Sequence, residues 1–159
     1  MPPITLRTAL PADQGTVVEL IHQLNVFEAD VVGDRRRDYG AAKEYYDELM
    51  QRLSRRNGRI VLAEADGVAV GAMGYSLDQD AAYVADAYRN HGTVTDLIVH
   101  NDWRGRGIGQ MLLNEAERLT KEAGLKRLMI GALVANERAE RTYRAFGFEP
   151  YVSILAKEL

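Results

Sequence analysis

The residue pattern with the clearest chemical meaning is R-G-R-G-I-G, at residues 104–109. It lies between an apolar run at residues 97–99 and a stretch with helical spacing at residues 110–123. The first N–H groups of a helix have no internal hydrogen-bond partner, and the helix dipole makes that end positive. Because glycines leave the backbone accessible, the pattern predicts a site for an anion such as a phosphate. The side chains of Arg104 and Arg106 would add positive charge to it.

Two common phosphate-binding patterns do not fit this turn. The P-loop has a lysine and then a serine or threonine after its last glycine, where this chain has Gln110 and Met111. The dinucleotide pattern has glycine at its sixth position, which is Gln110 when counted from Gly105. From the residues alone, the remaining alternative is a tight strand-to-helix turn that happens to be rich in glycine.

The elements that would hold this turn follow from apolar spacing and turn residues. Strands are expected at residues 4–8, 60–65, 68–75, 81–88, 94–99 and 125–134, with a final strand or strand pair within residues 148–159. Helices are expected from residue 11 through residue 24, at residues 39–55, from the glycine-rich turn to Gly124, and at residues 136–146. Residues 25–38 lack a pattern and are expected to be irregular. The sequence therefore predicts an α/β fold with a mostly antiparallel first half and one strand–helix–strand unit after it.

Composition narrows the class of protein. With 159 residues, 47% of them hydrophobic and 27% charged, the chain is expected to form a single domain over residues 1–159. The net charge of −3 argues against a broad nucleic-acid surface. There is no apolar run of membrane-spanning length and no signal-peptide pattern, so we expect a cytoplasmic protein without a membrane partner. The three scattered histidines lack metal-ligand spacing, and no metal is predicted.

Two blocks of the sequence are similar to the GCN5-related N-acetyltransferase (GNAT) family. The glycine-rich turn matches the acetyl-CoA signature Arg/Gln-x-x-Gly-x-Gly/Ala at Arg104 and its last two glycines. The second block, N-E-R-A-E-R-T-Y-R-A-F-G-F at residues 136–148, resembles a family pattern with Asn136, Ala139, Tyr143 and a closing Phe-Gly-Phe. The separation of the blocks and the order of elements before them also match. The resemblance is specific from about residue 94 to residue 148.

This resemblance implies the acyl-CoA N-acyltransferase fold: a mixed, mostly antiparallel sheet flanked by helices, with two central parallel strands splayed apart. It also implies acetyl-CoA as the acetyl donor, held largely by backbone groups. A backbone N–H near Leu97 or Ile98 would face the acetyl carbonyl, which by analogy contributes about 3 kcal/mol to catalysis. The implied cofactor residues are Leu97, Ile98 and Val99 for the pantetheine arm, Arg104, Gly105, Arg106, Gly107, Ile108 and Gly109 for the pyrophosphate, and Asn136. Asn136 is open to a second interpretation, as the cap of its helix.

Acetyl transfer to an amine also needs a base and an acid. A lysine-like amine has a pKa of ~10.4, so a carboxylate must attract it and take its proton. Asp96, an acidic residue within an apolar strand, is the candidate, with the alternative that it bonds a backbone N–H or an arginine. Tyr143 matches the general-acid tyrosine of the family and would protonate the leaving thiolate; it also falls on an apolar helix face and could simply pack there. Glu28 and Asp30 are candidates for binding a cationic substrate, or are solvated surface charges.

The roles of two further residue groups and the oligomeric state are left open by the sequence. The arginines at residues 35–37 are either a solvated loop or contacts for an acidic group of the substrate or cofactor. The spacing of Tyr45 and Tyr46 does not decide whether they line an acceptor pocket. The oligomeric state is also open, although the resemblance is compatible with a homodimer.

The sequence thus predicts an acetyl-CoA-dependent N-acetyltransferase whose acceptor is a primary amine, most simply that of a small molecule. With no cysteine in the chain, an acetyl-cysteine intermediate is impossible and direct attack in a ternary complex is favoured. The alternatives are a protein lysine or N-terminal acetyltransferase, and a non-catalytic acyl-CoA sensor.

Overall fold

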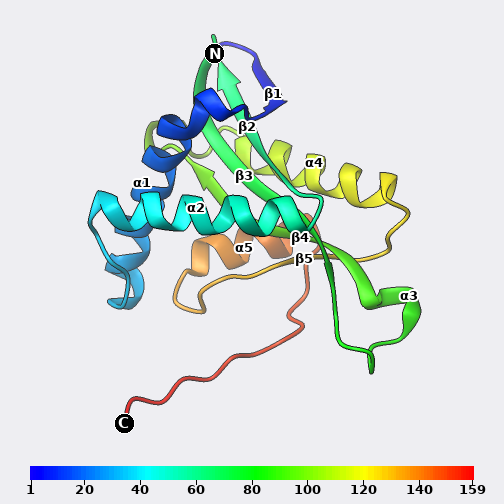
Figure 1. Cartoon of the computed structure of the whole chain (residues 1–159). Helices are drawn as coiled ribbons and strands as arrows, with labels where there is room; N and C mark the ends of the chain where they lie inside the picture. The colour runs from blue at the N-terminus through cyan, green and yellow to red at the C-terminus, as the bar shows by residue number, and fades with distance from the viewer.

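A computed structural model describes residues 1–159 and contains one five-stranded sheet (Figure 1). Its strands follow the order β1 (Ile4–Thr8), β2 (Arg59–Ala65), β3 (Val68–Gln79), β4 (Asn90–Val99) and β5 (Leu128–Ile130). Neighbouring strands are antiparallel except β4 and β5, which are parallel. The predicted mixed, mostly antiparallel sheet is therefore confirmed.

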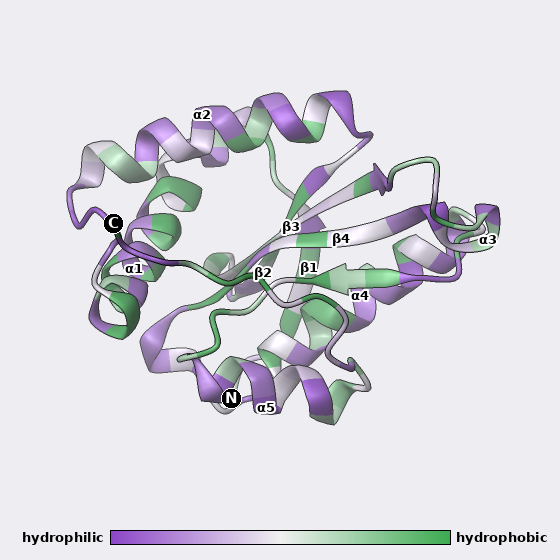
Figure 2. Cartoon of the chain, turned by 90° about the horizontal axis from the view of Figure 1, so that it is seen from below, coloured by the Kyte–Doolittle hydropathy of each residue, from purple (hydrophilic) through white to green (hydrophobic).

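Helices cover both faces of this sheet (Figure 1). On one face lie α1 (Gln14–Val32), which follows the 3₁₀ turn Pro11–Asp13, and α2 (Tyr39–Arg55). On the other lie α4 (Ile108–Glu122) and α5 (Glu137–Phe146). The short helix α3 (Asp86–Arg89) connects β3 to β4, and the 3₁₀ turn Asn101–Trp103 follows β4. Hydrophilic residues extend along much of α2 and α5 (Figure 2). No helix of the structure is both long and apolar enough to cross a bilayer.

Two apolar clusters, one on each face, attach the helices to the sheet. Ile21 of α1 and Leu53 of α2 pack with Leu62 of β2, and each is at most 1% exposed. On the other face Leu112 of α4 packs with Met73 of β3, and both are fully buried. Burial of each such side chain contributes about 1.5–3 kcal/mol to folding. The sheet is thus held rigidly where it carries the cavity described below.

The parallel pair β4–β5 lies at one edge of the sheet and separates after three residue pairs. Its register runs only from Gly92 opposite Leu128 to Val94 opposite Ile130. In the same place the β3–β4 register shifts, so that Thr95 has no partner in β3. An extra residue of this kind bends a strand and increases its twist. The two parallel strands separate as expected, but the pair lies at the edge of the sheet and not at its centre, because no strand follows β5 in the sheet. The rest of β4 is left without a neighbour on one side.

Most elements confirm the sequence prediction, but the segment at residues 25–38 is not irregular throughout: its first part, to Val32, is helical. Helix α1 continues through Val32 and ends at Gly33, whose φ of 76° is the left-handed conformation that favours glycine. The apolar spacing fails there because this part of α1 turns Phe27 and Glu28 into a cavity rather than into the core. A helix that lines a cavity keeps its backbone but loses its hydrophobic periodicity.

Three predicted strands also differ from the structure. Residues 81–88 form a turn and the start of α3; Tyr83 is 91% exposed, because no surface is available to bury its ring. The strand at residues 125–134 is reduced to β5, because the chain leaves the sheet after Ile130. Residues 148–159 contain no strand and extend from the body of the molecule (Figure 1), with Tyr151 and Leu155 exposed. Apolar alternation by itself does not supply the neighbouring edge that a strand needs.

Candidate active site

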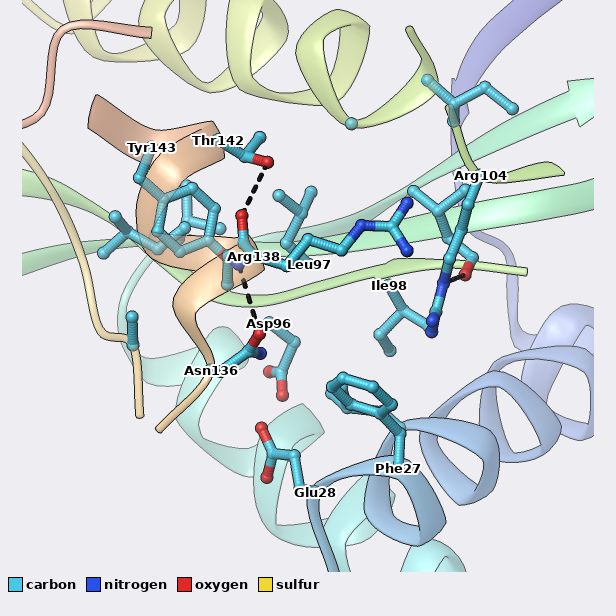
Figure 3. A pocket seen from close by; sticks show the side chains of 18 of the residues that line it. Phe27, Glu28, Asp96, Leu97, Ile98, Arg104, Asn136, Arg138, Thr142 and Tyr143 are labelled. Atoms are coloured by element: carbon cyan, nitrogen blue, oxygen red, sulfur yellow. Dashed lines mark hydrogen bonds between the residues drawn. The ribbon is translucent and has the colours of Figure 1, made fainter. Parts of the chain in front are cut away.

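A cavity of about 590 Å³ occupies the space between β4 and the segment that follows β5. Figure 3 shows its three walls: Phe27 and Glu28 from α1, Asp96, Leu97 and Ile98 from β4, and Asn136, Arg138, Thr142 and Tyr143 from the start of α5 and its first turns. The glycine-rich turn closes one end. The cavity therefore brings together segments that are more than 100 residues apart in the chain.

The glycine-rich turn presents backbone rather than side chains to this cavity. Gly105 and Gly107 line it, with φ of 75° and 79°, and Gly107 is the N-cap of α4 without any side-chain capping bond. The first N–H groups of α4 therefore have no side-chain acceptor, and they are available to a ligand at the positive end of the helix dipole. A cradle with these properties fits a diphosphate.

Two arginines make this end of the cavity basic, although only one of them was predicted. The Arg104 guanidinium lies 5.0 Å from the centre of the Phe27 ring, and its Nε donates to the Val99 carbonyl oxygen at 3.2 Å. Arg138 lines the same wall, and burial together with the charge of Arg138 lowers the pKa of Arg104. Arg106, in contrast, stacks on Trp103 at 4.7 Å and does not line the cavity.

The edge of β4 beyond Val94 forms the middle of the cavity. Leu97, Ile98 and Val99 all line it, and β5 pairs with none of them. Their main-chain groups on that edge are open to an extended ligand that adds to the sheet, apart from the Val99 carbonyl that Arg104 contacts. Asn136 also lines the cavity, while its Oδ1 accepts a hydrogen bond from the Ala139 N–H at 3.2 Å. Asn136 therefore caps α5, which agrees with one of the two interpretations of this residue from the sequence.

The opposite end of the cavity is acidic. Asp96 and Glu28 point toward one another there (Figure 3). Burial raises the pKa of Asp96 above its ordinary value, and the charge of Glu28 adds to this, whereas a hydrogen bond from Tyr45 opposes it. Arg35 lines the cavity beside them, and its Nε donates to Glu28 Oε2 at 3.2 Å. Asp30 is not part of this end, because it pairs with Arg37 on the surface.

Tyr143 enters the cavity from α5. Its ring packs edge-on against Phe148, with 6.1 Å between the ring centres, and no protein group hydrogen-bonds to its hydroxyl. Burial, and then the charges of Glu28 and Asp96, raise the pKa of Tyr143 to about 12. The hydroxyl therefore keeps its proton at neutral pH and is available as a donor.

Sequence reasoning missed Arg138, Phe27 and Thr142, which also line the cavity. Arg138 and Thr142 lie in the α5 block, where they are four residues apart and Arg138 is five before Tyr143. Residues four apart share a helix face, so their spacing places Arg138 and Thr142 together on one face of α5, although it does not relate either of them to Tyr143. Phe27 had no comparable signal, because the helix around it was not recognised.

Comparison with known sequences identifies the family. A sequence model of the Acetyltransferase (GNAT) family matches residues 25–148. The chain is 30% identical to an aminoglycoside N(6′)-acetyltransferase type 1 of Stenotrophomonas maltophilia, over 91% of this chain and 86% of that protein. It is 28% identical to an IAA acetyltransferase of Azospirillum brasilense, over 93% and 86% of the two chains.

Solved structures share the fold. A GCN5-related N-acetyltransferase from Ralstonia eutropha superposes with a TM-score of 0.77 at 21% identity, over 98% of this chain and 99% of that one. An aminoglycoside N-acetyltransferase, AAC(6′)-Iy, in complex with CoA gives a TM-score of 0.73 at 17% identity, over 100% and 96%. The architecture is thus that of the N-acyltransferases. The chain belongs to the Acetyltransferase (GNAT) family, and its enzymatic class is N-acetyltransferase.

Proposed function

We propose that this N-acetyltransferase transfers the acetyl group of acetyl-CoA to a primary amine of a small molecule, by direct attack in a ternary complex. The observation that carries this proposal is the polarity of one continuous cavity. A bare helix N-terminus with Arg104 and Arg138 lies at one end, and the carboxyl groups of Asp96 and Glu28 lie at the other. The basic end is complementary to a diphosphate and the acidic end to an ammonium group.

Acetyl-CoA, when bound, supplies an acetyl thioester that an uncharged amine can attack. The first N–H groups of α4, with Arg104 and Arg138, would bind its phosphates, and the open edge of β4 from Leu97 to Val99 would pair with its extended arm. A backbone N–H of this edge would donate to the acetyl oxygen, an interaction of about 3 kcal/mol in comparable oxyanion sites.

The side chains at the acidic end then account for the protons. Asp96 and Glu28 attract the ammonium form of the acceptor, and an Asp96 oxygen takes its proton, directly or through water. The amine nitrogen forms a bond to the acetyl carbon, and the carbon–sulfur bond breaks. Tyr143 Oη donates a proton to the departing sulfur and regains one from the nitrogen of the new amide. Asp96 releases the proton that it took from the ammonium group to solvent, which returns the site to its starting state. All three side chains line the cavity, which supports these roles.

A cationic small molecule is the acceptor class that these observations favour. Two carboxyl groups meet at the acceptor end, and the only cation that contacts them from the cavity wall is Arg35. The similarity to an aminoglycoside acetyltransferase, whose name denotes an aminoglycoside substrate, points in the same direction.

A free-thiol assay tests the proposal. The purified protein is incubated with acetyl-CoA and a panel of aminoglycosides, polyamines, amino acids and lysine peptides, and release of CoA thiol is followed. Acceptor-dependent release with a small cationic amine is the expected result, with intersecting initial-rate lines when both substrates are varied. Release with peptides alone would establish a protein acetyltransferase instead. Binding of acetyl-CoA without release for any amine would establish a sensor.

A further inference from the structure

Tyr45 of α2 contacts the candidate base from outside the cavity. Its hydroxyl lies 3.0 Å from Asp96 Oδ1 and 3.0 Å from Asp96 Oδ2. Tyr45 is not among the residues that line the cavity, so it does not reach a bound acceptor. Any effect of Tyr45 on acetyl transfer must therefore pass through Asp96.

We propose that Tyr45 is a positioning residue, which holds the Asp96 carboxylate toward the acceptor and sets the pH at which this carboxylate becomes available as a base. The inference rests on the proposed function, in which Asp96 accepts the proton of the amine. It assigns a role at the site to α2, a helix whose buried residues belong to the core on its face of the sheet.

The geometry supports positioning in two ways. The hydroxyl has one proton and is equidistant from both carboxylate oxygens, so its bond restrains the carboxylate in either orientation. A carboxylate has about four lone-pair sites, and those not used by Tyr45 remain available on the cavity side. Tyr45 is itself held in place because it packs against the buried cluster between α1, α2 and the sheet. The Asp96 side chain is thereby fixed from behind.

The groups around Asp96 determine the direction of the effect on pH. Glu28 faces it from α1, Tyr143 from α5, and Arg52 and Tyr45 from α2. Burial and Glu28 disfavour the carboxylate form, whereas the adjacent Thr95 hydroxyl, the Tyr45 hydrogen bond and the Arg52 charge favour it. Burial and the neighbouring Asp96 charge raise the pKa of Tyr45, so its hydroxyl remains a donor throughout the working range. Loss of the hydroxyl should therefore make Asp96 harder to ionise.

The test is the substitution Tyr45→Phe. A hydrogen bond to a charged group corresponds to about one to two pKa units. The acid limb of the pH profile of kcat/KM should therefore move to higher pH by about one to two units. The plateau value of kcat/KM, reached above this limb, should change much less. Tyr46→Phe is the matched control, because Tyr46 is the next residue of α2 but is 8% exposed within the core cluster. A Tyr45→Phe profile that superposes on the Tyr46→Phe profile would overturn the proposal.

A second measurement separates this inference from the proposed function. The titration of the Asp96 carboxyl carbon is followed by ¹³C NMR in the free enzyme, with Asp96→Asn to assign the signal. A higher midpoint in Tyr45→Phe supports the Tyr45 contact even if no amine is acetylated, and an unchanged midpoint overturns it whatever the activity.

The same pair of residues also provides a check on structural damage. In an Asp96→Asn background, Tyr45→Phe should leave the residual pH profile unchanged. A shift in that background would show that Tyr45 acts on the site through the fold instead of through Asp96, and would overturn the proposal.

Discussion

The substitution Gly107→Ala tests the phosphate cradle most directly. Gly107 has a φ of 79°, and a Cβ built there meets no protein atom within 4 Å. The added methyl group therefore causes no clash within the protein. It does force an L-residue into the left-handed region, at a cost of about 1–2 kcal/mol in the free energy of unfolding. For a chain of this size, that corresponds to a drop in Tm of about 2–8 °C.

The effect on CoA binding should be separate and larger. The methyl group enters the space next to the free N–H groups of α4, where the diphosphate is proposed to lie. Displacement of the phosphates would weaken their charge-assisted hydrogen bonds to these N–H groups, with a loss of about 1.5–3 kcal/mol in total. The dissociation constant for CoA should therefore rise about 10- to 100-fold or slightly more.

Gly124→Ala provides a matched control at the other end of α4. Gly124 has a φ of 74°, a Cβ there also meets nothing within 4 Å, and the residue lies outside the cavity. Calorimetric titration with CoA and thermal unfolding are measured for both variants. Both should lose similar stability, but only Gly107→Ala should lose affinity. Equal CoA affinity in the two variants would refute the assignment of the turn to the diphosphate.

The other predictions concern the acceptor end and the proton donor. Tyr143→Phe should lower kcat about 10²- to 10⁴-fold while the dissociation constant for CoA stays the same, and an unchanged kcat would remove this hydroxyl from the mechanism. Because burial raises the pKa of Asp96, wild-type kcat/KM should fall as the pH decreases through a value above the ordinary ~3.9 of an aspartate. Asp96→Asn should abolish this acid limb, and its persistence would point to another base. Arg35→Gln should lower KM for cationic amines about two- to fivefold, because the guanidinium no longer competes for Glu28. Arg37→Gln, which removes a surface pair with Asp30, should leave KM unchanged; a higher KM in Arg35→Gln would indicate that Arg35 binds the acceptor.

The cofactor half of the site could be predicted from the sequence because its signals are local. Three glycines within residues 104–109 and the helix that follows them are contiguous, and two of the glycines have the left-handed φ that the turn requires. Asn136 and Tyr143 likewise belong to one helix. Local patterns did not reveal which of the two turn arginines reaches the cavity. Arg104 does so by bonding the Val99 carbonyl, whereas Trp103 holds Arg106 away from it.

The acceptor half could not be predicted in the same way, because it is assembled from distant residues. Tyr45 and Asp96 are 51 positions apart, and their contact depends on how α2 packs across the sheet. Glu28 was recognised as a candidate, but on an irregular segment, because the apolar periodicity of α1 fails where the helix lines the cavity.

The loss of periodicity in α1 has a physical cause that also bears on function. A helix that covers the core must repeat apolar residues every three or four positions, but a helix that lines a polar cavity is released from this requirement. The second half of α1 lines the cavity with Phe27 and Glu28, while Ile21 and its neighbours anchor the first half in the core. Substitution of the cavity-lining residue Glu28 in this half should therefore change acceptor preference at little cost in Tm, whereas Ile21→Ala should cost about 2–5 kcal/mol in stability. A large loss of Tm in Glu28→Gln, with acceptor preference unchanged, would show that this part of α1 serves the core and would remove it from the acceptor site.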